Sequence, residues 1–183
     1  MKCFYYYIIL FLVFLISTQP VKAENIHFNN DIYKLKAADT GTAGSVINTY
    51  FKDNENDKYW TSKIEIIYFP DISSPVKYSN NIDKKIESDE ACVLLKFVQN
   101  KKKEISVISY LENQTQQEKT FFIYNIYKYE KHPQKGMMTL RFAKKYLFNT
   151  NEDIVKMAKE VKETNNDYME RIIISPIPPI IEK

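Results

Sequence analysis

The chain contains few of the residues on which several common functional sites depend. Its 183 residues include 3 Gly, 2 Cys, 2 His and 1 Trp. Three glycines exclude collagen-like sequence, glycine linkers and a glycine-rich phosphate loop. Two His and two Cys leave too few ligands for a zinc or haem site, so we expect no metal and no cofactor. The formal net charge of +3 is too small for a dedicated nucleic-acid-binding protein.

The N-terminal residues predict a secretory signal peptide over residues 1–23. Lys2 precedes an unbroken apolar run from Phe4 to Ile16, and Val21 and Ala23 are small residues at the −3 and −1 positions of a cleavage site after Ala23. The alternative is a retained membrane anchor, but a membrane span usually needs about 20 apolar residues. We therefore expect an exported protein, periplasmic or extracellular, with no stable membrane insertion after cleavage.

Cleavage would also change the charge and the cysteine count. Loss of Lys2 and Lys22 lowers the number of Lys and Arg from 26 to 24, against 23 Asp and Glu, which leaves a net charge of +1. Cys3 would be removed, so Cys92 would be the one remaining cysteine and no internal disulfide could form. Cys92 opens an apolar run and is expected to be a buried structural thiol. The abundance of Asn, Ile and Lys, with two arginines, is typical of an AT-rich bacterial genome.

The mature chain, residues 24–183, predicts a single α+β domain. Residues 24–30 are polar and are expected to be loose. Strand-like alternation marks the ranges 32–37, 45–52, 60–69, 91–99, 104–112, 119–131 and 137–148. Short connections predict a hairpin from 45–52 and 60–69 and an antiparallel meander from the last four ranges. Residues 121–124 are apolar on both faces, which indicates a central strand covered on both sides.

Two helices and an extended tail complete the prediction. Ser74 followed by Pro75 is a helix start, and the apolar stripe continues to residue 87. Thr150 and Asp153 have the spacing of a capping box that opens a helix to about Arg171. The Pro-rich tail, residues 174–183, cannot be helical and is expected to dock on its own domain rather than on a partner. The prediction is an antiparallel sheet of about six to seven strands with two main helices packed on it.

Two resemblances follow from these residues. The order of strands and helices resembles the PsbP-like fold of photosystem extrinsic proteins and of several small exported bacterial proteins. Tyr50, Glu55, Trp60-Thr61 and the stretch from Phe69-Pro70 to Ser74-Pro75 resemble a motif of uncharacterised exported bacterial proteins, although Asn54 stands where those usually have glycine. Neither resemblance implies a catalytic residue.

The candidate ligand-binding residues are Glu55, Tyr59 and Trp60, at the end of the connection between residues 52 and 60. A polar loop carried on a rigid sheet commonly hosts binding, and an indole offers apolar area with one N–H donor. We predict a partly exposed Trp60 that lines a groove beside the loop. The alternative is that Trp60 only packs in the core of the hairpin.

Other candidates have weaker patterns. Asp53, Glu55 and Asp57 have the spacing that opens a calcium loop, but Lys58 replaces the required glycine and Ile64 the final glutamate. His27 and His132 are too isolated for a triad or a metal site. The lysine pairs and triplet at 84–85, 101–103 and 144–145 could form an anion-binding face, but at a net charge of +1 they are expected to be solvated and to keep the sheet edges and the helix face soluble.

The functional prediction is an exported, non-catalytic binding or accessory module whose partner is an unknown protein or small ligand, and not a nucleic acid. No catalytic residue is assigned. The alternative is a carboxylate-dependent hydrolase in the periplasm, with Glu55 and Asp57 as acid and base.

Overall fold

Residues 25–116 and 119–181 are described by the computed structural model, and they form eight β-strands, one short 3₁₀ helix and two α-helices. The strands are β1 (Asn25–Phe28), β2 (Asp31–Thr40), β3 (Val46–Phe51), β4 (Ser62–Phe69), β5 (Cys92–Asn100), β6 (Ile105–Gln116), β7 (Lys119–Lys131) and β8 (Met137–Leu147). The helices are η1 (Thr42–Gly44), α2 (Pro75–Ser88) and α3 (Asn151–Ile174). The predicted signal peptide, residues 1–23, lies outside the described residues. Neither described α-helix is long and apolar enough to cross a bilayer.

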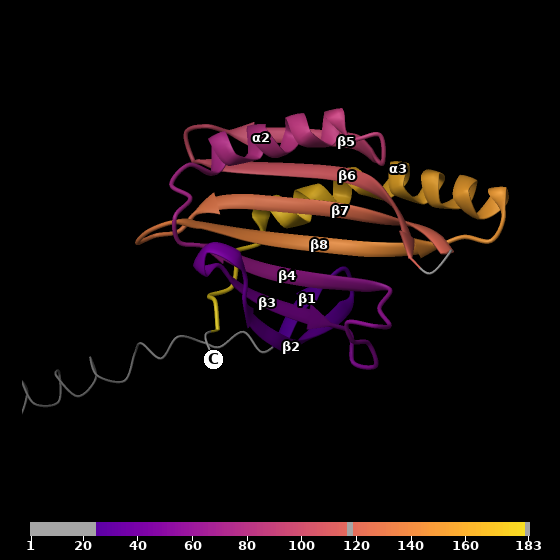
Figure 1. Cartoon of the computed structure of the whole chain (residues 1–183), viewed down its shortest axis with the longest axis horizontal. Coiled ribbons are helices and arrows are strands. Elements are labelled where there is room, and N and C mark those ends of the chain that lie inside the picture. The colour runs from indigo at the N-terminus through magenta and orange to yellow at the C-terminus, as the bar shows by residue number, and fades with distance from the viewer. Residues whose placement is uncertain (1–24, 117–118, 182–183) are drawn as a thin grey trace, which may run out of the picture.

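All eight strands belong to one antiparallel sheet, in the order β1-β2-β3-β4-β8-β7-β6-β5 (Figure 1). Each half of the chain forms a meander of neighbouring strands, as the short connections predict. The halves join where β4 pairs with β8, which places Glu65 opposite Arg141. Helix α2 carries the chain from β4 to the far edge of the sheet, where β5 begins.

The first strand, β1, was not expected, and it raises the strand count above the predicted six to seven. Residues 24–30 look polar, yet Asn29 and Asn30 have φ angles of 54° and 67° and form a two-residue turn. Asparagine tolerates this left-handed conformation better than most residues, and such turns suit a β-hairpin. The turn lets Phe28 pack its ring 4.8 Å from that of Phe142. Burial of one aromatic ring therefore orders the short strand.

Three other boundaries differ from the prediction. Strand β6 continues to Gln116, although a turn was expected from residue 113, because its pairing with β7 extends through Gln116 opposite Lys119. Strand β4 begins at Ser62 and not at Trp60, so Trp60 lies in the connection that precedes the strand. Helix α3 ends at Ile174, three residues beyond the predicted Arg171.

The predicted helix starts are confirmed in atomic detail. The Ser74 hydroxyl accepts a hydrogen bond from the Lys77 backbone N–H at 3.3 Å. At α3, Thr150 Oγ1 accepts from the Asp153 N–H at 3.2 Å, and Asp153 Oδ2 accepts from the Thr150 N–H at 3.0 Å. Each cap satisfies backbone donors that a helix cannot pair internally.

The two α-helices cover opposite faces of the sheet, α2 in front of it and α3 behind it in Figure 1. Helix α3 packs on β6, β7 and β8, on the side to which Tyr124 and Ile126 point. Helix α2 packs on β5, β6 and β7, where its Ile86 meets Ile108. Because side chains alternate along a strand, neighbouring residues serve different faces. We call these the α3 face and the α2 face.

The tail after α3 docks on the α3 face, as the sequence favours. Ile177 and Ile180 pack against the main core cluster. Asn48 is fully buried, and its side chain donates to the Ile181 carbonyl at 2.9 Å and accepts from the Ile181 N–H at 2.7 Å. Lys128 Nζ donates to the Ser175 carbonyl at 2.7 Å, at the end of α3. The tail is thereby held at Ser175 and at Ile181.

We expect the change Gly136→Ala to destabilise the fold by about 2 kcal/mol, as measured by urea unfolding. Gly136 has φ +86°, and an added Cβ would lie 2.4 Å from the Phe69 carbonyl oxygen. Gly44→Ala is the matched control, because Gly44 has a similar φ of +70° but an added Cβ would lie 3.8 Å from its nearest neighbour, Pro70 Cγ. Gly44→Ala should lower the free energy of unfolding by about 1 kcal/mol, because alanine is strained at a positive φ but meets no close neighbour there. Equal losses for both variants would contradict the steric argument.

Candidate functional site

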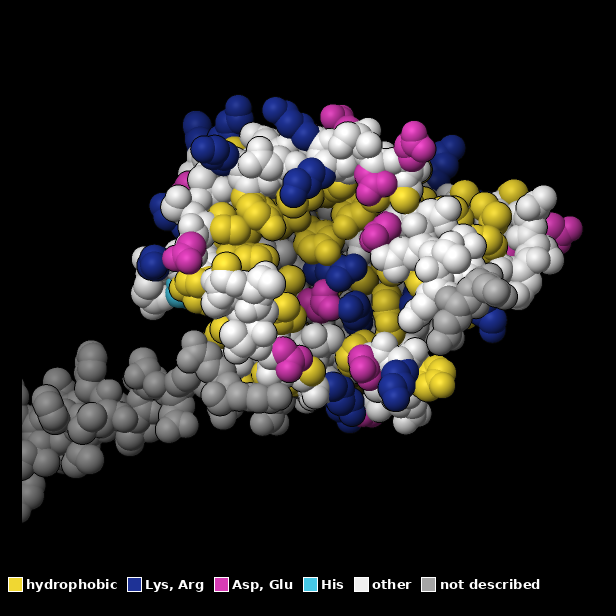
Figure 2. All heavy atoms as spheres, viewed as in Figure 1, with side chains coloured by type: hydrophobic (Ala, Val, Ile, Leu, Met, Phe, Trp, Pro, Cys, Tyr) yellow, Lys and Arg dark blue, Asp and Glu magenta, His cyan; other side chains and the backbone are white. Residues whose placement is uncertain are grey.

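Helix α2 covers only part of the α2 face. Figure 2 shows the uncovered part as a hollow in which basic and acidic side chains lie among hydrophobic ones. By strand register, the side chains on this side of β4, β8 and β7 include Glu65, Arg141 and Asn125. We call this surface, from Tyr110 on β6 to Lys63 on β4, the open face.

A buried ion pair occupies the middle of the open face. Arg141 Nη1 donates to Glu65 Oε2 at 2.7 Å, and the two side chains are only 17 % and 11 % exposed. The guanidinium also donates to Asn125 Oδ1, from Nε at 3.1 Å and from Nη2 at 2.8 Å. Its carbon lies 5.2 Å from the centre of the Tyr127 ring. Arg141 is thus fixed by a carboxylate, an amide and an aromatic face.

Burial alone would raise the pKa of Glu65, but Arg141 and Lys63 outweigh burial and hold the pKa of this carboxyl below its usual range. Lys63 Nζ donates to Glu65 Oε1. Burial alone would likewise lower the pKa of Arg141, yet Tyr127 and Glu65 raise it. Both groups are therefore charged at neutral pH. A carboxylate held in this way cannot serve as a proton donor at neutral pH.

This pairing predicts a stability that depends on pH. Because the folded pKa of Glu65 is lowered, its contribution is complete above the usual glutamate pKa of about 4.3 and is lost as the pH falls through the folded-state value. The free energy of unfolding of the wild type should fall as the pH is lowered from about 5 to about 2, the range in which Glu65 becomes protonated. We expect this fall to be smaller in Glu65→Gln.

Asp53→Asn is the control for the Glu65 experiment. Lys34 lowers the pKa of Asp53, but this carboxyl is on the surface, with 64 % of its side chain exposed. Solvent screens such pairs, so the control should follow the acid dependence of the wild type. An unchanged slope in Glu65→Gln would contradict the assignment.

Trp60 lies at one end of the open face. It packs on the buried residues Phe121, Ile123 and Ala143 and is itself only partly buried. Two ammonium groups lie near its ring: Lys145 Nζ is 4.2 Å and Lys63 Nζ 5.2 Å from the ring centroid. These contacts are short enough for cation–π attraction. The partial exposure of Trp60 agrees with the prediction of a partly exposed indole. Its packing on Phe121 shows that Trp60 also covers the core.

Two pockets meet at Trp60. One, of about 490 Å³, is lined by Glu55, Tyr59 and Trp60, so the structure brings the three candidate residues together. The other, of about 330 Å³, is lined by Trp60, Asp57 and Glu65 among others. Glu55 and Asp57 therefore line different pockets. Nothing in this geometry places them as acid and base across one bond, so the hydrolase alternative has no geometric support.

Lysines dominate the charge of the 490 Å³ pocket, which we call the Trp60 pocket. Lys58, Lys119 and Lys145 line it, against one carboxylate, Glu55. That carboxylate is already engaged, because Glu55 accepts from the Thr61 hydroxyl and pairs with Lys52 at 3.7 Å. The pocket therefore carries excess positive charge.

Lys145 is the most confined of these three lysines. Burial lowers its pKa and so does repulsion from Lys63, while Glu55 acts in the opposite direction. Among the described residues, no carboxylate lies within salt-bridge distance of Lys145, whereas Lys63 pairs with Glu65 and Lys144 with Glu160. An anion that enters the pocket would therefore stabilise the charged form of this half-buried ammonium group.

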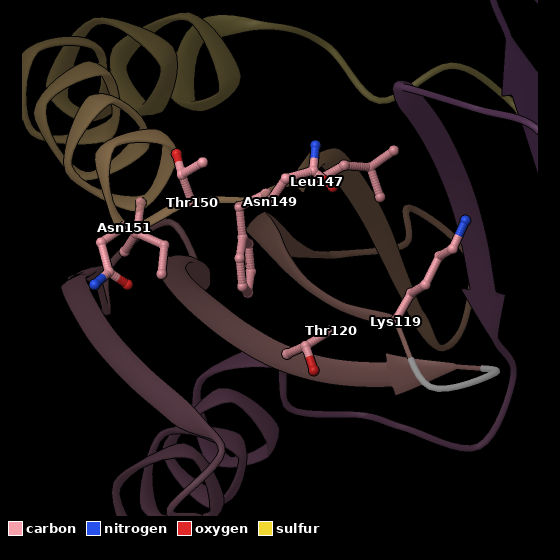
Figure 3. A pocket seen from close by; sticks show the side chains of 8 residues that line it. Lys119, Thr120, Leu147, Asn149, Thr150 and Asn151 are labelled. Carbon is pink, nitrogen blue, oxygen red and sulfur yellow. The ribbon is translucent and has the colours of Figure 1, made fainter.

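A larger pocket, of about 700 Å³, lies at the start of α3 beside the ends of β7 and β8 (Figure 3). It shares Lys119 and Leu147 with the Trp60 pocket, and its other labelled side chains, such as Asn149 and Asn151, are polar. The helix N-terminus there is already capped by Thr150 and Asp153. Phe148 and Ile154 also line this pocket, but its charged lining residue, Lys119, is exposed, so the pocket lacks the confined lysine of the Trp60 pocket.

The remaining sequence candidates lie outside the open face. His132 lies in the β7–β8 connection with its ring 5.0 Å from Tyr68, and His27 lies on β1. Burial raises the pKa of the partly buried Cys92 thiol to about 11, which disfavours the reactive thiolate. Within residues 25–116 and 119–181 no group of three or more His, Cys, Asp and Glu side chains is placed to hold a metal ion.

Sequence reasoning missed Glu65, Arg141 and Asn125 on the open face. It also expected Lys145 to be solvated, whereas Lys145 is partly buried beside Trp60. A weak signal was present, because Glu65 interrupts the apolar segment 64–67 and Arg141 the segment 137–143. A charge within a central strand needs a partner. The partner could not be named without the β4–β8 register.

The fold and the site define an α+β protein with one sheet face open and a charged, aromatic-walled pocket at its end. Residues 21–177 match an uncharacterised bacterial-type protein family, and the chain belongs to that family. No curated protein matches the chain. The family match agrees with the resemblance to uncharacterised bacterial proteins.

Proposed function

We propose that this protein is an exported, non-catalytic binding module and that the Trp60 pocket is its binding site. One observation carries the proposal: Tyr59 and Leu147, 76 % and 70 % exposed, line the same pocket as the partly buried Trp60. Exposed apolar side chains that gather around one cavity are typical of a recognition site. The pocket volume of about 490 Å³ lies in the range of small-molecule sites, about 300–1,000 Å³.

Photo-crosslinking in the native host tests this proposal. A photo-crosslinking amino acid in place of Tyr59 should form an adduct with a ligand or partner, detected by intact mass. The matched control is the same amino acid in place of Val155, which is 67 % exposed on α3. Adducts at position 59 alone support the site. No adduct at position 59, or equal yields at both positions, would overturn it.

Export is the second part of the proposal, and it rests on the apolar run 4–16 and on the residues before Glu24. The intact mass of the protein from its native host should correspond to a chain that begins at Glu24. A chain that retains Met1 in the membrane fraction would make it an anchored protein.

The PsbP-like order of elements also remains a proposal. Superposition of the eight-stranded sheet on the sheet of a photosystem extrinsic protein tests it, and a different strand order would reject it.

A further inference from the structure

We propose that the ligand of the Trp60 pocket is a small amphiphilic anion, whose carboxylate or similar group pairs with Lys145 while its apolar part lies on Trp60, Phe121 and Leu147. This inference rests on the proposed function and names the class of ligand. The pocket offers a cation and an apolar wall side by side, and each selects one part of such a molecule.

Lys145 supplies the confined positive charge of the Trp60 pocket. Lys145 Nζ lies 4.2 Å from the Trp60 centroid and 5.1 Å from the Phe121 centroid. Its ammonium group is therefore held against the rings that would contact the apolar part of a ligand. Lys63, on the same indole, already has Glu65 as its partner. An incoming anion would thus find Lys145 available and partly shielded from water, where ion pairs are stronger than on the surface.

Trp60, Phe121 and Leu147 form an apolar wall in this pocket. Trp60 is partly buried, Phe121 is buried and Leu147 is exposed, so the wall runs from the core to the rim of the cavity. Tyr59 adds an exposed ring at the rim. A small inorganic anion would leave this wall uncovered, and a neutral apolar molecule would leave Lys145 without a partner. Only a molecule with both parts uses the whole pocket.

Titration with octanoate tests the inference in the full chain, with Trp60 emission as the readout because Trp60 is the sole tryptophan. Octanoate should change the emission saturably. Octanol and octylammonium, of equal chain length, should bind about tenfold more weakly or worse, the loss expected for one ion pair. Acetate should leave the emission unchanged, because it lacks the apolar chain.

A matched pair of variants assigns the charge. Lys145→Met keeps the apolar stem and should weaken octanoate about tenfold while octanol binding stays the same. Lys159→Met should bind octanoate as the wild type does, because Lys159 lies on α3 with 76 % of its side chain exposed. Octanoate affinity should also fall as the pH rises through the lowered pKa of Lys145, and this pH dependence should be lost in Lys145→Met.

Three titration results would overturn the inference. They are equal affinity for octanoate, octanol and octylammonium, wild-type affinity in Lys145→Met, and no emission change with octanoate. Stable binding to phosphatidylglycerol vesicles without octanoate binding would also overturn it, in favour of a membrane surface as the anion source. Crosslinking at position 59 is independent of these titrations. A failed charge preference with retained crosslinking rejects the ligand class alone, whereas a failed crosslink rejects the binding site.

Discussion

Arg141→Met should lower the free energy of unfolding by about 3–5 kcal/mol, the usual cost of removing one partner of a buried ion pair. The variant leaves the Glu65 carboxylate, only 11 % exposed, with Lys63 as its remaining charged partner. It also removes both donors to Asn125 Oδ1, on a side chain that is fully buried. Urea unfolding followed by far-UV circular dichroism measures the loss.

A double-mutant cycle separates the pair from ordinary packing losses. Glu65→Leu combined with Arg141→Met removes both charges of the pair. Lys63 loses its carboxylate partner in Glu65→Leu and in the double variant alike, so this loss cancels in the cycle. The double variant should lose clearly less stability than the sum of the two single variants, with a coupling of about 1–3 kcal/mol. Additive losses would show that the ion pair contributes nothing beyond the volume of its side chains.

Local sequence patterns predicted the helix starts and the hairpins well because those features depend on neighbouring residues. The two α-helices are capped by residues at their own N-terminal ends: Ser74 with Pro75, and Thr150 with Asp153. The strand β1 escaped prediction because its stability comes from the contact of Phe28 with Phe142, more than a hundred residues away. A contact of that kind depends on tertiary packing and leaves no local pattern.

The same distinction explains the candidate site. Glu55, Tyr59 and Trp60 are close in sequence, and one short connection was enough to predict that they lie together. Lys145 and Trp60 meet only because β4 pairs with β8, where the Lys145 N–H donates to the Thr61 carbonyl at 2.8 Å. The cation that defines the proposed ligand class therefore depends on a pairing between distant segments.

The apolar stretch 121–124 shows how a correct pattern can have an unforeseen cause. It predicts a strand covered on both sides, and both sides are covered. Tyr124 belongs to the core cluster beneath α3, but Phe121 and Ile123 are covered by Trp60 and not by a helix. Trp60 therefore both lines the candidate ligand site and covers β7, so substitutions of Trp60 will affect stability as well as binding.

Removal of residues 177–183 should lower the free energy of unfolding by about 2–4 kcal/mol, as the truncated chain loses the burial of two isoleucines. Ile177 and Ile180 pack against the main core cluster on the α3 face. The truncation also removes both hydrogen bonds between Asn48 and Ile181. Ile174→Ala is the control and should stay within about 0.5 kcal/mol of the wild type, because Ile174 is 80 % exposed.

A second variant separates the hydrogen bonds of the tail from the burial of its isoleucines. Asn48→Ala in the full chain leaves the Ile181 N–H and carbonyl without their partner and should cost about 1–3 kcal/mol. In the truncated chain the same substitution should cost less, because the Asn48 side chain has already lost Ile181 and can bind water. Equal costs of Asn48→Ala in both chains would mean that Asn48 acts through its own strand and that the tail is held by its isoleucines alone.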